Sequence, residues 1–239
     1  MMKSFFLLYL SFFSLLSAEP FCYFVPPKGW KMIEPSQLSS TTLIAFVAPS
    51  HEPFRASINL GSEKTNVSLQ DYIEAVKKRF SSKREHEWKS LGYIKTQAGN
   101  AHLSSVETKH GFGQTTSLQA ILSIDNTIYV MTALSLKEDF SSYYPVFLKT
   151  FESFSHCSDL LDSVLPSQRE LLSQKIESVA EAVKKLSEQK KKTSSIPKTF
   201  QKKQFQSFEK YLEKSFKEKG LAWKFLVCQE IYSKKEASK

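Results

Sequence analysis

Alternating apolar and polar residues organise the middle of the chain, residues 91–135, into two predicted β-hairpins. The first pairs 91–98 with 101–109 around Gly99-Asn100, and the second pairs 115–124 with 127–135 around Asp125-Asn126. Gly, Asn and Asp tolerate the positive φ angles that two-residue hairpin turns require. Neither strand of the second hairpin has a fully polar face, so we expect this sheet to be covered, at least in part, on both sides.

Further strands and two helices are predicted around these hairpins. Three short apolar runs ended by turn residues are typical of strands: residues 21–25, 42–48 and 55–60. Ser68 is a good N-cap for a helix whose apolar residues recur at helical spacing up to Phe80. A second helix, with an aromatic face, begins near Ser141 or Ser142, because Pro145 is tolerated only in a first turn. This order predicts an α+β fold, an antiparallel sheet with helices packed on it.

The last third of the sequence predicts a C-terminal helical hairpin. Its first helix has an apolar stripe from Leu172 to Leu186 and ends in the lysines at 190–192. The second helix carries a stripe of four apolar side chains: Phe205, Phe208, Leu212 and Phe216. The residues from Leu221 onward continue as a third short helix, or 223–227 form a strand.

Composition and charge divide the chain at the same boundary. Its 239 residues are 41% hydrophobic, enough for a packed core. Residues 158–239 carry a net charge of +7, whereas residues 19–157 carry +1. We therefore expect an α+β domain at 19–157 followed by a basic helical extension at 158–239.

Residues 1–18 are interpreted as a signal peptide that directs export. Lys3 supplies the positive charge, a short apolar run follows, and Ser17-Ala18 are the small residues of a cleavage site. The run is too short for a membrane span, which needs roughly 20 apolar residues. We expect a periplasmic or secreted protein; a retained N-terminal anchor is the alternative.

Several segments of the α+β domain resemble the PsbP-like superfamily. The resemblance rests on "FVPPKGW", "ASINL", "SLQDYIEAV", the long run from Gly99 to Ser135, and "FSSYYPVFLKTFESF". It covers residues 21–154 and implies a PsbP-like α/β/α sandwich. Members of this family mostly act as binding or accessory modules, so the resemblance implies no catalytic residue and no cofactor.

Export would place Cys22, Cys157 and Cys228 where disulfides persist. Cys22 and Cys157 bracket the predicted domain, so a bridge between them would close it. In the chain-entropy model a loop of this length contributes about 4–5 kcal/mol. The alternative is that both cysteines are small apolar residues of the core.

Residue types capable of catalysis or metal binding occur without a recognisable pattern. Glu85-His86-Glu87 is interpreted as a solvated charge cluster, because consecutive side chains do not readily converge on one metal. His102 and His110 are two separate positions along the sheet, and "HGFG" at 110–113 is a turn. We predict no catalytic, metal or cofactor site, while a triad assembled in space stays open.

These features favour an exported, non-enzymatic binding or accessory protein of a bacterial-type envelope. The alternatives are a hydrolase with a site assembled from distant residues, and a structural protein that self-associates through its C-terminal helices. We expect the stripe at Phe205, Phe208, Leu212 and Phe216 to dock on an envelope protein or an anionic membrane surface. The alternative is that the stripes of the C-terminal helices pack on each other or on the core. Nucleic acid is not expected, because acidic residues alternate with the lysines of this helix.

Overall fold

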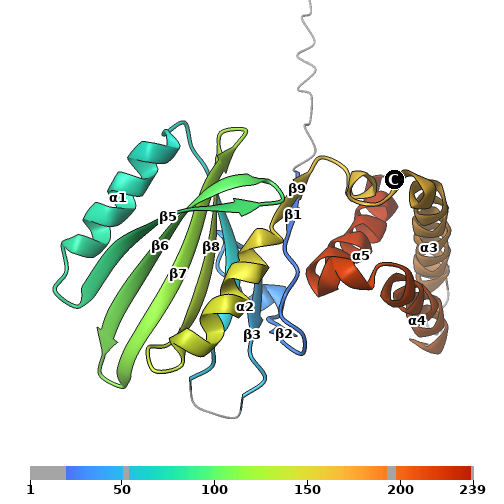
Figure 1. Cartoon of the computed structure of the whole chain (residues 1–239). Helices are drawn as coiled ribbons and strands as arrows, with labels where there is room; N and C mark the ends of the chain where they lie inside the picture. Colours follow the sequence, from blue (N-terminus) through green and yellow to red (C-terminus); the bar gives the residue numbers. More distant parts are fainter. Residues whose placement is uncertain (1–19, 51–53, 193–197, 238–239) are drawn as a thin grey trace, which may run out of the picture.

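Figure 1 shows the computed structural model of the chain, which describes residues 20–50, 54–192 and 198–237. The predicted signal peptide, residues 1–18, lies outside these ranges. In chain order the elements are β1 (Phe21–Tyr23), β2 (Lys31–Met32), η1 (Pro35–Gln37), β3 (Thr42–Val47), β4 (Ser57–Lys64), α1 (Leu69–Ser81), β5 (His86–Thr96), β6 (Gly99–His110), β7 (Gly113–Ile124), β8 (Thr127–Leu136), α2 (Phe140–Glu152), β9 (Ser155–Cys157), η2 (Leu160–Ser163), α3 (Pro166–Lys192), α4 (Lys198–Ser215), η3 (Lys217–Lys219) and α5 (Gly220–Ala237).

Within the described ranges, seven strands form one antiparallel sheet in the order β2-β3-β4-β8-β7-β6-β5. The short strands β1 and β9 pair separately. Helices α1 and α2 lie on opposite sides of the large sheet (Figure 1). The α+β fold with helices packed on an antiparallel sheet is therefore confirmed, and so is the expectation that both sides of the sheet are covered.

The main core lies between the large sheet and α2. Alternate residues of β7 and β8 point to this side, as the period of two in a strand requires. The fully or nearly buried members of these strands are Leu118, Ala120, Leu122, Tyr129, Met131 and Ala133. From α2 they meet Phe147 and Phe151, both 0% exposed. Burial of these large rings explains why the aromatic stripe of α2 faces the sheet.

One of the two predicted hairpin turns forms at the expected residues, and the other does not. Asp125-Asn126 has φ angles of 48° and 58° and forms the β7–β8 turn as predicted. The β5–β6 turn consists of Gln97-Ala98, two residues before the predicted Gly99-Asn100, which instead begin β6. The amides of this turn donate to the carbonyl oxygens of Glu152 and Phe154, at 3.1 and 3.0 Å. The end of α2 therefore fixes the position of the turn.

Both predicted helices form, with one change of boundary. Ser68 caps α1, since its side chain accepts a hydrogen bond of 3.1 Å from the Asp71 amide. Helix α2 begins at Phe140, one or two residues earlier than predicted, so Pro145 lies beyond the first turn. Contacts of the Phe140 ring with Tyr144, at 5.6 Å between ring centroids, accompany this additional helical residue. Aromatic packing thus outweighs the cost of an internal proline.

The predicted helical hairpin is extended by α5, which excludes the strand alternative for 223–227. Gly220, with a φ angle of 77°, caps the end of η3 and is the first residue of α5. A Cβ atom at Gly220 would lie 3.0 Å from Pro26 Cδ and 3.2 Å from Val25 Cα, so the two backbones approach closely. Trp223 is 0% exposed, and its Nε1 donates to Ser163 Oγ at 2.7 Å. The basic extension therefore packs on the end of the α+β domain.

Helix lengths and hydropathy bear on membrane insertion. Within the part of the chain that the structure describes, no helix is long and apolar enough to cross a membrane.

Candidate functional site

The side of the large sheet that faces α1 carries a continuous row of polar residues. Strand pairing sets Ser90 opposite Ser104, Ser104 opposite Gln119, Gln119 opposite Thr132, and Thr132 opposite Asn59. Side chains of directly paired residues point to the same side of a sheet. We call these five residues the polar row; each of them offers an uncharged hydroxyl or amide group.

Four buried polar atoms gather around this row without a hydrogen-bond partner among the described residues. We call them the unpaired cluster: Trp88 Nε1, His102 Nδ1, Ser104 Oγ and Gln119 Oε1. Ser104 is 0% and His102 6% exposed, so water does not reach them from the surface. A buried polar group without a partner costs about 1–3 kcal/mol. Groups of this kind require an explanation, such as a functional role or a buried water molecule.

His102 lies at the centre of this arrangement. The Trp88 ring stacks nearly parallel to it at 6.1 Å between centroids, and the Tyr93 ring meets it edge-on at 5.6 Å. Its Nε2 atom lies 3.0 Å from Ser90 Oγ. Burial lowers the pKa of His102 below its ordinary value. The imidazole is therefore neutral at neutral pH and can both donate and accept a hydrogen bond.

Helix α1 covers this region through few apolar contacts. Ile73 is its fully buried residue, and Lys77 Nζ lies 6.0 Å from the centroid of the Trp88 ring. At the C-terminal end Phe80 meets the His86 ring edge-on at 5.4 Å. The helix therefore leaves the β7, β8 and β4 part of the row half-buried, at Gln119, Thr132 and Asn59.

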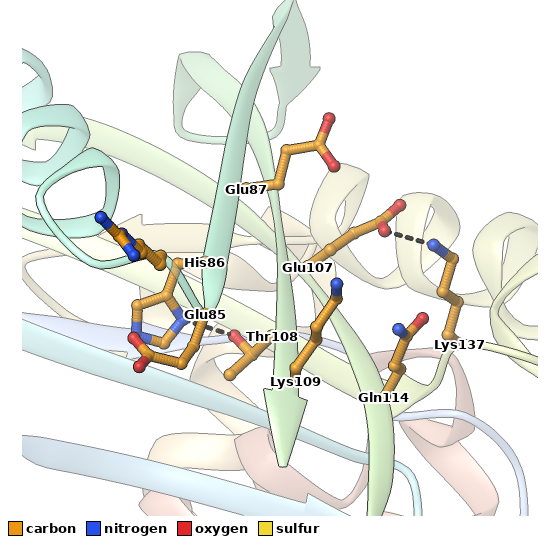
Figure 2. A pocket seen from close by; sticks show the side chains of 9 residues that line it. Glu85, His86, Glu87, Glu107, Thr108, Lys109, Gln114 and Lys137 are labelled. Atoms are coloured by element: carbon orange, nitrogen blue, oxygen red, sulfur yellow. Dashed lines mark hydrogen bonds and ion pairs between the residues drawn. The ribbon is translucent and has the colours of Figure 1, made fainter.

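A second candidate is a charged depression of about 270 Å³ at the ends of β5, β6 and β7 (Figure 2). Both carboxylate and cationic side chains line it. Glu107 accepts a hydrogen bond of 2.5 Å from Lys137, and Lys89 hydrogen-bonds Glu87, which holds the pKa of that carboxyl below its ordinary value. Directly opposed Glu87 and Glu107 would repel each other. The lysines neutralise them, so the depression has a structural explanation.

The charged and histidine residues considered in the sequence analysis lie at different places on the large sheet. Glu85-His86-Glu87 lines the charged depression, where His86 Nδ1 lies 2.9 Å from Thr108 Oγ1 (Figure 2). His110 stacks on Phe112 at 4.9 Å beside the β6–β7 turn, far along the strand from His102. The structure therefore keeps His102 and His110 apart.

Cys22 and Cys157 lie on the paired strands β1 and β9, with their thiols free. Their register is offset: Cys22 is opposite His156, and Cys157 is opposite Phe21. Neighbouring residues of a strand point to opposite sides, so a bridge would need a shift of one residue. Burial raises the pKa of the Cys22 thiol to about 12, so it is protonated beside His156 and is a poor nucleophile. The disulfide stays a prediction.

The predicted partner-binding stripe of α4 lies largely inside the molecule. Phe208, Leu212 and Phe216 are at most 3% exposed, and Phe216 packs on Trp223 at 5.1 Å. The side chain of Phe205 lies outside the described part of the structure. The three buried side chains pack against other helices of the extension, which is the alternative that the sequence left open.

Sequence reasoning missed the polar row and the unpaired cluster. The available signal was the presence of Ser104, Gln119 and Thr132 inside strands that are otherwise apolar. The register of the strands, which places these residues next to one another, could not be read from the sequence.

Comparisons with known proteins give likenesses of fold. No family model matches the sequence, and no curated protein is significantly similar to it. The structure is similar to LpqN, involved in cell envelope biogenesis of Mycobacterium tuberculosis, with a TM-score of 0.46, 10% identity, and coverage of 58% of this chain and 84% of that one. It is also similar to the cyanobacterial PsbP (CyanoP) of Synechocystis, with a TM-score of 0.42, 10% identity, and coverage of 59% and 95%. Both similarities cover just under 60% of this chain and concern its fold alone.

Proposed function

We propose that this protein is an exported binding or accessory protein of a bacterial-type envelope, and that it binds through the α1 side of its large sheet. The observation that supports this site is the unpaired cluster. Two of its atoms belong to Ser104 and Gln119 of the polar row, and the other two to Trp88 and His102 on the same side of the sheet. A ligand can reach the row from the surface at its half-buried members Gln119, Thr132 and Asn59.

Export is supported by the sequence pattern of residues 1–18. Intact-mass measurement of the protein from the envelope fraction tests it, with a chain beginning at Glu19 as the expected result. A chain that still begins at Met1 in that fraction would contradict cleavage.

Binding through the polar row is tested by pull-down from envelope extract. The Gln119→Leu variant removes one group of the row, and Gln114→Leu is the matched control, since Gln114 lies on the same strand but lines the charged depression. We expect Gln119→Leu to lose the captured component and Gln114→Leu to retain it. The opposite result would move the site to the depression in Figure 2.

A hydrolase is the second candidate, because one observation favours it. Ser90 Oγ and His102 Nε2 lie 3.0 Å apart, the distance expected of a nucleophile and its general base. Against it, His102 Nδ1 has no partner in the described ranges, so no carboxylate there orients the imidazole. Labelling by a fluorophosphonate probe that is lost in Ser90→Ala would establish the enzyme; the binding proposal predicts no labelling of Ser90.

The role proposed for the C-terminal extension is association with an envelope protein or an anionic membrane surface. With the apolar stripe largely buried, the exposed lysines of the extension would supply the attraction, about 1 kcal/mol each near an anionic surface. A chain truncated after Ser158 tests this proposal against full-length protein, with anionic and neutral vesicles compared at low and high salt. Equal binding by both chains would exclude the extension as the site.

A further inference from the structure

Strand β5 is the last strand of the large sheet, and its outer edge has no neighbouring strand within the described ranges. The opposite end of the sheet is β2, which has 2 residues, whereas β5 has 11. An unpaired edge of that length presents a row of backbone amides and carbonyls to a further strand. The fold therefore leaves the outer edge of β5 available for pairing.

The direction of the backbone groups along β5 follows from one hydrogen bond. The Lys109 amide of β6 donates to the Glu85 carbonyl at 3.0 Å, so the backbone groups of Glu85 point toward β6. These groups alternate in direction along an antiparallel strand, so those of His86, Trp88 and Ser90 point away from the sheet. The His86 amide already donates to a carbonyl of the preceding loop at 3.2 Å. Among the described residues, this leaves the His86 carbonyl and the amides and carbonyls of Trp88 and Ser90 for a further strand.

A β-bulge limits the stretch of β5 that can pair. The β5–β6 register shifts between Ser90 and Gly92, and Gly92 has a φ angle of 90°. Such a bulge bends the strand and increases its twist. The register is regular before the bulge, over residues 86–90, so a second strand can follow this segment.

The charges on this segment are self-complementary. Glu87 and Lys89 lie on the side of β5 opposite to Trp88, and their side chains are 60% and 57% exposed. If two copies of residues 86–90 pair antiparallel around a two-fold axis at Trp88, Glu87 of each copy is opposite Lys89 of the other. Directly opposed charges of opposite sign stabilise a strand pair. An axis one residue away would set Glu87 or Lys89 opposite itself, so charge selects this register.

Glu87 lies in an environment that favours a further cation. It is directly opposite Glu107 on β6, and the two carboxylates extend to the same side (Figure 2). Within the chain, Lys89 bonds Glu87 at 2.9 Å and Lys137 bonds Glu107. Lys89 of a second copy would approach Glu87 from the open edge, on the side away from Glu107. An additional cation there offsets the repulsion between the two opposed carboxylates.

The remaining positions of this register are compatible with pairing. Trp88 is opposite Trp88 of the second copy, and aromatic cross-strand pairs are favourable. The amide of each Trp88 reaches the Trp88 carbonyl of the other copy, and each Ser90 amide reaches the His86 carbonyl. The C-terminal end of α1 lies beside His86, because the Phe80 ring meets the His86 ring at 5.4 Å. The two His86 residues are about 14 Å apart along the strands, so the α1 ends lie on opposite sides of the axis.

We infer that this protein forms a two-fold symmetric dimer in which residues 86–90 of β5 pair antiparallel with the same residues of a second copy. The large sheet then continues from one subunit into the other. Because the long free edge of each copy is used, association stops at two copies. This surface belongs to the α+β domain and is distinct from the C-terminal helices considered for self-association in the sequence analysis.

Analytical ultracentrifugation of the full-length protein without its predicted signal peptide, at low ionic strength, tests this inference. We expect a concentration-dependent equilibrium between monomer and dimer. Glu87→Lys sets cations opposite Lys89, and Lys89→Glu sets carboxylates opposite Glu87, so each should weaken the dimer about tenfold. Lys95→Glu is the matched control: it makes the same charge change on β5 beyond the bulge and should dimerise like the unchanged protein.

Mixing the two weakened variants tests the register directly. The Glu87→Lys subunit presents cations at both positions, and the Lys89→Glu subunit presents carboxylates at both. A heterodimer therefore restores opposite charges at every opposed pair. We expect the mixture to dimerise about as strongly as the unchanged protein, and this recovery also shows that both variants are folded.

Amide hydrogen exchange at low and high protein concentration locates the pairing. The Trp88 and Ser90 amides should exchange more slowly at high concentration, because they become hydrogen-bonded across the axis. The amides of Tyr93 and Lys95, which lie beyond the bulge, should be unchanged.

Four results would overturn the inference. The first is a monomer at every concentration. The second is a dimer that persists in both charge variants, which would place self-association elsewhere, as on the C-terminal helices. The third is a mixture of the two variants that stays monomeric. The fourth is a dimer that Lys95→Glu weakens as much as Lys89→Glu does.

Discussion

Replacing two tryptophans by phenylalanine gives a direct test of the unpaired cluster. Trp88→Phe removes an indole N–H that has no partner among the described residues. Trp223→Phe removes one that donates to Ser163 Oγ at 2.7 Å. The two changes delete the same atoms, so the difference between them reports mainly how each N–H is satisfied.

The two substitutions should change the free energy of unfolding differently. Trp223 is 0% exposed, so its substitution loses a hydrogen bond, about 0.5–1.5 kcal/mol, and leaves a cavity that costs about 1–2 kcal/mol more. Trp88 is half-buried, so its cavity costs less, and removal of an unpaired N–H returns about 1–3 kcal/mol. We expect Trp223→Phe to lower the free energy of unfolding by about 2–3 kcal/mol. Trp88→Phe should be neutral or slightly stabilising.

Urea unfolding followed by far-UV circular dichroism measures both changes without relying on tryptophan fluorescence. A difference of about 2 kcal/mol also corresponds to about 4–8 °C in Tm for a chain of this size. Equal losses in the two variants would refute the reasoning, because the Trp88 N–H would then be hydrogen-bonded in the free protein, by buried water. The unpaired cluster would no longer indicate a ligand.

Other predictions concern the packing of the extension, a helix cap and the pH dependence of stability. Gly220→Ala should cost about 1–3 kcal/mol in urea unfolding, because its φ is 77° and the new Cβ would meet Pro26 Cδ at 3.0 Å; Gly111→Ala, with open space around it, should be nearly neutral. Ser68→Ala should lower stability by about 1 kcal/mol and loosen α1 in hydrogen exchange, while unchanged exchange would contradict a capping role. Because burial lowers the pKa of His102, the unfolded chain binds its proton first as the pH falls below about 6.5. Stability should fall there, less steeply in His102→Gln; identical slopes would exclude this contribution.

Local sequence determined the structural features that depend only on residues close together in the chain. Alternation along β7 and β8, the Asp125-Asn126 turn and the Ser68 cap all follow from backbone preferences and side-chain periodicity. These preferences act within a few residues, so they are readable in one chain. The Gly99-Asn100 turn failed for the complementary reason, because the C-terminal end of α2, some fifty residues away, decides where that turn falls.

In the extension, too, local sequence determined the helix and tertiary structure determined what it packs against. Periodicity predicted the apolar stripe of α4, but Phe208, Leu212 and Phe216 could equally have faced a partner or the rest of the chain. Tertiary structure decided for burial, next to Trp223. A stripe specifies that a helix must pack on something, and only the positions of the other helices specify on what.

The candidate site was decided entirely by tertiary structure. Ser90, Ser104, Gln119, Thr132 and Asn59 come from five strands, and none of them is distinctive in its own segment. Strand register aligns them into one row, and a shift of one residue in any strand would turn its member to the other side of the sheet. Register results from the summed packing of the whole core. For that reason the sequence by itself determined the strands, whereas the alignment of polar groups across them exists only in the folded protein.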